Sequence, residues 1–308
     1  MALFFFLLLT LFWGCSFIAI RFSLEGFPPF VAAGLRILIA TLFFCALVVA
    51  RRTPSGSAKG AIWRLIGVGI LNFAFPWACL FWGEQTVSPA LASILNSTMP
   101  IWVLLCAWML LPDEPPTWLK GVGVAIGFLG ISLVFAPGLE GGENIAGMAV
   151  ILLMAVSYAL GAVLTRKIAL AIDIRWSLII QGTASALLLF ALSVPTEGLG
   201  WTSSIWQNPK AIWGILYLGV FSTALAWLMY FRLIRDWGAL RASSVTYAMP
   251  FVSIAADWLY FRKIPSHTQL AGAGAILSGL SLIHWARVKE IRRRRALSAG
   301  SKSAAPAS

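Results

Sequence analysis

The chain has 308 residues, of which 60% are hydrophobic and only 11% are charged, and its formal net charge is +12. A soluble domain is about half apolar and about a quarter charged, so this composition excludes a soluble globular protein and also a disordered chain. The basic residues lie at the ends of apolar runs and do not form a basic face, which argues against a nucleic-acid partner. The composition therefore predicts an all-α polytopic membrane protein whose surroundings are the lipid bilayer.

Apolar runs bounded by charged residues and prolines predict ten transmembrane helices. A helix needs about 20 apolar residues to cross the hydrocarbon core of a bilayer. The runs cover residues 3–20, 28–50, 62–82, 89–111, 119–136, 146–165, 174–194, 211–231, 242–261 and 268–286. The first run has no basic segment before it and no cleavage site after it, so we interpret it as a retained span and not as a signal peptide.

The distribution of basic residues predicts the orientation of these spans. An even number of spans puts both termini on one face, and the loops of that face carry most of the 23 Lys and Arg residues. The loops of the opposite face carry Arg21, Lys210, Arg262 and Lys263. Under the positive-inside rule, both termini are expected to be cytoplasmic. We expect residues 287–308, which include four consecutive arginines, to form a basic, disordered cytoplasmic tail.

The chain contains two copies of one five-span unit. A shift of 150 positions aligns a series of identical residues: Gly69 with Gly219, Ala74 with Ala224, Trp77 with Trp227, Phe81 with Phe231, Ala92 with Ala242, Ser93 with Ser243, Met99 with Met249, Pro100 with Pro250 and Trp108 with Trp258. We therefore divide the chain into a first repeat, residues 1–137, and a second repeat, residues 146–286. Because five is odd, the second repeat must be inverted, an arrangement typical of secondary transporters that bind substrate near the bilayer midplane.

A polar stripe on two equivalent spans predicts part of the substrate cavity. It consists of Ser93, Asn96, Ser97 and Pro100 in the fourth span and of Ser243, Thr246, Tyr247 and Pro250 in the ninth. Polar groups left unpaired in lipid cost about 1 kcal/mol or more each, so such a stripe faces either a hydrogen-bonding partner helix or a wet cavity. The two prolines favour the cavity, because a proline frees a backbone carbonyl that needs a polar neighbour. Neighbouring spans complete the predicted cavity wall with Trp13, Ser16, Asn72, Trp77, Tyr158, Trp227 and Tyr230.

Three charged residues in or beside the spans need an explanation. Asp257 extends the polar stripe, and we weigh three roles for it: binding a substrate amine, carrying a coupling proton, or lying hydrated near the outer interface. Arg36 lies about two turns into the second span, and its role stays open between a functional one and a structural one. The structural interpretation, in which it reaches the interface or caps loop carbonyls, is favoured. Glu84, at the end of the third span, is interpreted as an ordinary hydrated carboxylate.

Small residues in the fifth and tenth spans predict close helix packing. The row in the fifth span is Gly121, Gly123, Gly127 and Gly130, and the row in the tenth span is Ala271, Ala275 and Gly279. Two interpretations of these rows stay open: packing within a repeat, and a homodimer interface. The four cysteines, together with His267 and His284, lack metal-ligand spacing. We therefore predict no metal site and no cofactor.

Several segments resemble the EamA-type transporters of the drug/metabolite transporter superfamily. They are residues 11–17 (LFWGCSF), 34–36 (GLR) and 90–100 (ALASILNSTMP), with the glycine pattern of the fifth and tenth spans. The resemblance implies ten transmembrane helices, cytoplasmic termini, a bacterial inner-membrane location, and export of amino acids or related metabolites from a central cavity. The family usually has Gly-Glu before the last span of each half. This chain has Glu114 in the first half but Arg262 and Lys263 in the second, so no role is carried over for the second acid.

These observations predict a secondary transporter that exports a small-molecule substrate by alternating access. The chain has no GxxxxGK[ST] motif, which excludes direct use of ATP. A passive channel is the second interpretation, since an inverted repeat is compatible with one. An enzyme would need an intramembrane acid–base pair, a metal cluster or a nucleophile, and neither HExxH nor GxSxG occurs, so we predict no enzymatic activity.

Overall fold

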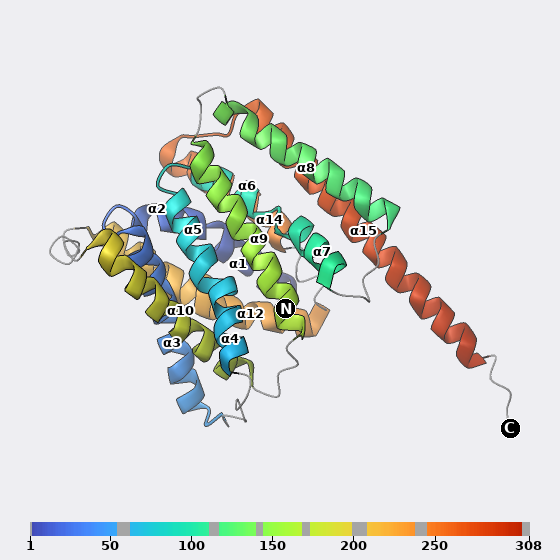
Figure 1. The fold of residues 1–308 in the computed structure, drawn as a ribbon, viewed down its shortest axis with the longest axis horizontal. Helices are drawn as coiled ribbons and strands as arrows, with labels where there is room; N and C mark the ends of the chain where they lie inside the picture. The colour runs from blue at the N-terminus through green and yellow to red at the C-terminus, as the bar shows by residue number, and fades with distance from the viewer. Residues whose placement is uncertain are drawn as a thin grey trace.

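The computed structural model describes residues 2–53, 62–110, 117–139, 144–167, 173–198, 208–237 and 245–303, and all the regular structure in these residues is helical. Eight segments are long and apolar enough to cross a membrane. They are Ala2–Ser23, Pro29–Ala50, Ile62–Gly83, Pro89–Leu110, Trp118–Pro137, Ile145–Thr165, Ile174–Glu197 and Pro209–Tyr230. Helices α14 (Val245–Phe261) and α15 (His267–Ser303) follow them, so ten helical segments succeed one another along the described chain (Figure 1). The predicted all-α polytopic fold is confirmed.

Among the described residues, six of these segments are single helices, one of them the long helix α15, and four are interrupted. The other five single helices are α3 (Pro29–Ala50), α8 (Trp118–Leu139), α9 (Ile145–Lys167), α10 (Ile174–Glu197) and α14. The first segment consists of α1 (Ala2–Gly14) and α2 (Ser16–Ser23), and the fourth of α6 (Pro89–Asn96) and α7 (Met99–Leu110). The third consists of α4 (Ile62–Gly69), the π-helix η1 (Ile70–Ala74) and α5 (Phe75–Gly83); the eighth consists of α11 (Pro209–Leu216), η4 (Tyr217–Leu225) and α12 (Ala226–Trp237). The tenth, α15, continues beyond a membrane span.

Equivalent helices of the two repeats pack against each other in opposite directions. At the start of α3, the Phe30 and Val31 N–H groups donate to the Glu197 carboxylate at the end of α10, at 2.7 and 3.1 Å. At the other end of the same pair, Arg175 Nη1 donates to Thr53 Oγ1 at 2.7 Å. Because these equivalent helices are antiparallel, the second repeat is inverted relative to the first. We call the face where α1 begins the terminal face and the face where α2 ends the opposite face.

Helices α8 and α15 lie side by side (Figure 1), and their glycine rows pack against each other and join the two repeats. A Cβ atom added at Gly123 would lie 2.7 Å from the Gly279 carbonyl oxygen, and one added at Gly130 would lie 2.6 Å from the Gly272 carbonyl oxygen. The earlier glycine of α8 meets the later glycine of α15, and the later one meets the earlier, so these two helices are also antiparallel. The small-residue rows are compatible with packing within a repeat or with a homodimer, whereas the structure places this contact between the repeats. Periodicity alone does not reveal which helix covers a small-residue face.

The two π-helical segments occupy corresponding positions in the two repeats. A π turn displaces backbone carbonyls from their usual helical donors. Side chains of neighbouring helices bond to carbonyls in or beside these segments: Ser185 Oγ donates to Gly69 O at 3.0 Å, Ser157 Oγ to Leu71 O at 2.9 Å, and Trp13 Nε1 to Ser222 O at 3.1 Å. The π segments therefore lie against polar donors at the contact between the repeats.

The fourth span breaks into two helices, which the sequence analysis predicts as one run. The break falls at Ser97 and Thr98, just before Pro100. Because Pro100 has no N–H, the Asn96 carbonyl loses its helical donor. In the ninth span, Pro250 lies inside α14, which stays continuous over its described residues.

The last helix is longer than predicted. α15 continues through Ser303, whereas the basic composition predicts a disordered tail from residue 287. Lys120 Nζ of α8 lies 2.8 Å from Glu290 Oε2 of α15 and is only 2% exposed. This ion pair joins the two helices beyond their glycine contact.

Candidate functional site

Five aromatic side chains form a continuous series of ring contacts where the two repeats meet. The ring centroids are 5.3 Å apart for Trp13 and Tyr230, 6.0 Å for Tyr230 and Trp227, 6.1 Å for Trp227 and Phe73, and 5.4 Å for Phe73 and Trp77. Each such pair contributes about 0.5–1.5 kcal/mol beyond its buried area. We call these five residues the aromatic cluster. Four of them are predicted cavity residues; Phe73, four residues before Trp77 on the same helical face, is an addition from the structure.

Arg36 of the first repeat lies against this cluster. Its guanidinium carbon is 4.1 Å from the centroid of the Trp77 ring. Its Nε donates to Thr223 Oγ1 at 3.0 Å and its Nη2 to Ser222 Oγ at 3.3 Å, both in η4 of the second repeat. The side chain is 6% exposed, so the interpretation that it reaches the interface or caps loop carbonyls is wrong. Its hydroxyl partners are more than 180 residues away in the sequence, which is why the local pattern did not reveal them.

The Arg36 guanidinium has hydrogen-bonding capacity left over. A guanidinium carries five N–H donors, and the two bonds to Ser222 and Thr223 use two of them. Within the described part of the chain, no other hydrogen bond and no ion pair within 4 Å involves this group. A buried charge without an ion-pair partner is costly, so this arrangement is suited to an anionic group of a ligand. Next to it, Trp77 Nε1 donates to the Tyr158 hydroxyl.

The remaining predicted cavity residues lie around the aromatic cluster and between α6 and α14. Ser16 is buried and donates to Trp13 O at 2.6 Å, and Asn72 Nδ2 donates to Thr165 Oγ1 at 3.3 Å. Ser93 and Ser97 are buried, and each hydroxyl bonds a carbonyl three residues earlier in its own segment. Pro250 is buried, and five further predicted residues are half-buried: Asn96, Pro100, Tyr158, Thr246 and Tyr247. Ser243 of the predicted stripe lies outside the described residues.

Two acidic residues are buried near the opposite face. Asp257 of α14 is 1% exposed, and its Oδ2 accepts a hydrogen bond from the Ala90 N–H at 3.3 Å. The interpretation of Asp257 as a hydrated residue is therefore wrong. Glu84, which follows α5, is 0% exposed, so its interpretation as an ordinary surface carboxylate is also wrong. A span end is hydrated only where no neighbouring segment covers it. Beside Glu84, Arg21 of α2 bonds the main chain and α9 packs against the preceding Gly83.

Glu84 has an unusual environment for a carboxylate. Neither of its carboxylate oxygens has a hydrogen-bond partner in the described structure. Burial raises the pKa of Glu84 well above its ordinary value, Arg21 and Arg36 lower this pKa, and Asp257 raises it further. Arg21 Nη1 donates instead to the backbone carbonyls of Glu84 and Gln85, at 2.5 and 2.9 Å.

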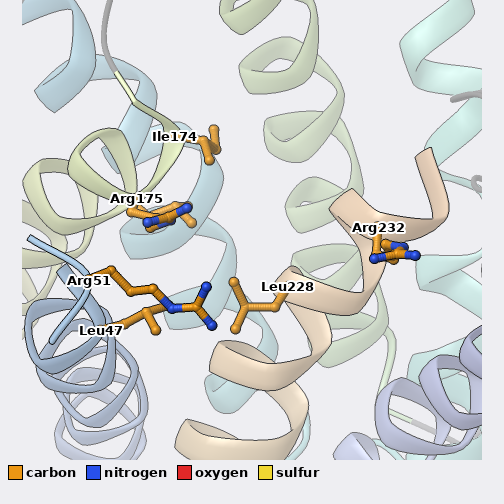
Figure 2. A pocket seen from close by; sticks show the side chains of 7 residues that line it. Leu47, Arg51, Ile174, Arg175, Leu228 and Arg232 are labelled. Atoms are coloured by element: carbon orange, nitrogen blue, oxygen red, sulfur yellow. The ribbon is translucent and has the colours of Figure 1, made fainter. Parts of the chain in front are cut away.

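A cavity of about 500 Å³ lies at the terminal face between α3, α10 and α12. Aliphatic and basic side chains line it: Leu47, Arg51, Ile174, Arg175, Leu178, Leu228 and Arg232. Figure 2 shows the Arg51 side chain extending from the end of α3 toward Leu228 on α12. Leu47 follows Arg36 by eleven residues, about three helical turns, so both lie on one face of α3, roughly 16 Å apart along the helix.

The fold and the site define a class of protein. The described chain has ten helical segments in two inverted repeats, and the Arg36 guanidinium is buried between the repeats against the aromatic cluster. This is the architecture of a multi-pass membrane transporter. The model of the EamA-like transporter family matches residues 1–136 and again residues 145–285. The chain belongs to the EamA-like transporter family.

Known proteins similar to this chain agree with that assignment. Transporter YvbV of Bacillus subtilis is 28% identical over 282 residues, which cover 90% of this chain and 89% of YvbV. Inner membrane transporter YedA of Escherichia coli K12 is 27% identical over 254 residues, which cover 80% of this chain and 78% of YedA. One crystal structure aligns with a TM-score of 0.62 over 91% of this chain and 95% of the other, and its 18% identity indicates a shared fold alone.

Proposed function

We propose that this protein is a secondary transporter that exports small organic metabolites, amino acids or related compounds, across the bacterial inner membrane by alternating access. The observation that carries the proposal is the Arg36 guanidinium, buried between the two repeats against Trp77 and with unused N–H donors. A group at this position changes its surroundings whenever one repeat moves relative to the other. Alternating access requires a binding site at such a position.

The chemistry of the site supports a solute that has both a carboxylate and an apolar part. A guanidinium binds a carboxylate through paired N–H donors. The aromatic cluster offers ring faces to the apolar part of the same molecule, and the two sets of groups are in contact through Trp77. Amino acids have this combination of groups.

The asymmetry between the faces supports loading from the cytoplasm. The cavity opens at the terminal face, which the distribution of basic residues predicts to be cytoplasmic. At the opposite face, two hydrogen bonds join the repeats: Ala90 N–H donates to Asp257, and Ser253 Oγ donates to Pro89 O at 2.9 Å. Three arginines around the cavity attract anionic solutes toward it.

Transport by the purified protein in liposomes tests the proposal. We expect saturable flux of at least one amino acid or related carboxylate, and a loss of about tenfold or more in the Trp77→Ala variant because its ring contacts Arg36. Trp63→Ala is the matched control, since Trp63 is 81% exposed. Correctly folded wild-type protein that moves no member of a broad metabolite panel would refute transport. Flux that does not saturate would favour a passive channel.

A further inference from the structure

Glu84 is a buried acid to which the proposed transport site assigns no role. It lies where the third span ends at the opposite face, directly before the segment that leads into α6. Its side chain is fully buried, and both carboxylate oxygens lack a hydrogen-bond partner in the described structure. A carboxylate anion that is buried without hydrogen bonds is strongly destabilised, and taking up a proton removes that penalty.

The charged groups around Glu84 come from three elements. Arg21 at the end of α2 bonds the main-chain carbonyl of Glu84 and forms no ion pair within 4 Å of its carboxylate. Arg36 of α3 and Asp257 of α14 also act on Glu84 through their charges. Helix α9 meets the end of α5 with Gly147 and Ile151, which carry no charge. No described group therefore neutralises the carboxylate by direct contact.

The contacts beside Glu84 hold the two repeats together at the opposite face. Six residues later, the Ala90 N–H donates to Asp257 Oδ2, and the Pro89 carbonyl accepts from Ser253 Oγ. We call these two hydrogen bonds the opposite-face contact. Separation of α6 from α14 would break both hydrogen bonds and would admit water to the neighbouring turn that carries Glu84. A hydrated Glu84 has the ordinary acidity of a glutamate side chain.

We propose that Glu84 binds a proton when the opposite face is closed and releases it when that face opens, so that opening is linked to proton release. This inference rests on the proposed function, because it assigns the proton-binding group of an alternating-access cycle. The proton binds more tightly in the closed state, so closure is favoured at low pH. The equilibrium constant for closure falls by up to about tenfold per pH unit as the pH rises from the ordinary pKa of Glu toward the raised pKa of buried Glu84.

Hydrogen–deuterium exchange of the full-length protein in detergent tests this linkage without any solute. The readout is the protection factor of peptides covering residues 84–92 and 250–261, because protection factors remove the intrinsic pH dependence of amide exchange. Between about pH 5 and about pH 9, we expect protection of both peptides to fall at least tenfold in the wild type. We expect Glu84→Gln, which cannot lose a proton, to stay protected throughout. Glu25→Gln is the matched control, since Glu25 is an exposed acid near the same face, and it should behave like the wild type.

Asp257→Asn gives a second measurement that keeps Glu84 in place. Asparagine retains an oxygen that can accept from the Ala90 N–H, but it removes a negative charge that raises the Glu84 pKa. We expect Asp257→Asn to lose protection with rising pH as the wild type does, but with the midpoint of this loss at a lower pH. The proposal is overturned if the wild type shows no pH dependence, if Glu84→Gln keeps it, or if the Asp257→Asn midpoint stays in place. Failure of transport would refute the proposed function and leave these exchange results interpretable.

Discussion

Arg36 shows how one side chain depends on partners from the other repeat. Its charge is buried against the Trp77 ring, and its two hydrogen bonds end on hydroxyls of η4. A cation over a desolvated aromatic ring gains about 2 kcal/mol, which offsets part of the cost of burying the guanidinium. An anionic solute would offset more of that cost, so the affinity for such a solute should depend on this residue.

We expect Arg36→Gln to weaken binding of a transported carboxylate by about 10- to 100-fold, because a hydrogen bond to a charged group contributes about 1.5–3 kcal/mol. Binding of the corresponding primary amide should change little. Calorimetric titration of the purified variants measures both affinities. Arg64→Gln, which alters an exposed arginine of α4, is the control. An equal loss for the acid and the amide would show that Arg36 supports the fold and does not recognise the carboxylate.

At the scale of elements, the contact between α8 and α15 depends on the absence of side chains. Each helix brings its backbone so close to the other that an added methyl group meets backbone atoms. Such small-residue contacts let helices associate in lipid, where the hydrophobic effect does not drive them together. The same contact joins the two repeats, so it is a determinant of the whole fold.

Two glycines of α15 provide a matched test of this packing. A Cβ atom at Gly272 would lie 2.7 Å from the Gly130 carbonyl oxygen, whereas one at Gly274 would meet nothing within 4 Å. We expect Gly272→Ala to destabilise the protein by about 1–3 kcal/mol through overpacking. Gly274→Ala should be neutral or stabilising, since alanine has the higher helix propensity. Thermal unfolding in one detergent compares the variants, and equal melting temperatures would contradict the close contact.

At the scale of the whole molecule, hydrogen bonds between described span ends join residues that are expected on the same face. Arg175 meets Thr53 at the terminal face, and Glu197 meets Phe30 and Val31 at the opposite face. The structure thus determines which span ends lie together. The assignment of the terminal face to the cytoplasm follows from the basic residues alone.

Thiol labelling in intact cells tests that assignment. Lys263 and Lys289 are exposed residues near the opposite and terminal faces, respectively. In a chain whose four native cysteines are replaced by alanine, we expect a membrane-impermeant reagent to label Lys263→Cys from outside. Lys289→Cys should be labelled only after the membrane is permeabilised. The reverse pattern would place the termini outside the cell and reverse the proposed direction of transport.

The sequence by itself determined the class of fold, because spans and repeats are recorded in local composition and in identities at one fixed separation. Trp77 and Trp227 were predicted as cavity residues from this pattern, and the aromatic cluster brings them together through Phe73. The tertiary structure alone decided the surroundings of Arg36 and Glu84. Their burial depends on segments that fold over them from elsewhere in the chain, and a span-end charge has the same local sequence whether water or another helix covers it. Charge burial is a property of packing between distant helices, which is why only the folded molecule distinguishes a surface residue from a site residue.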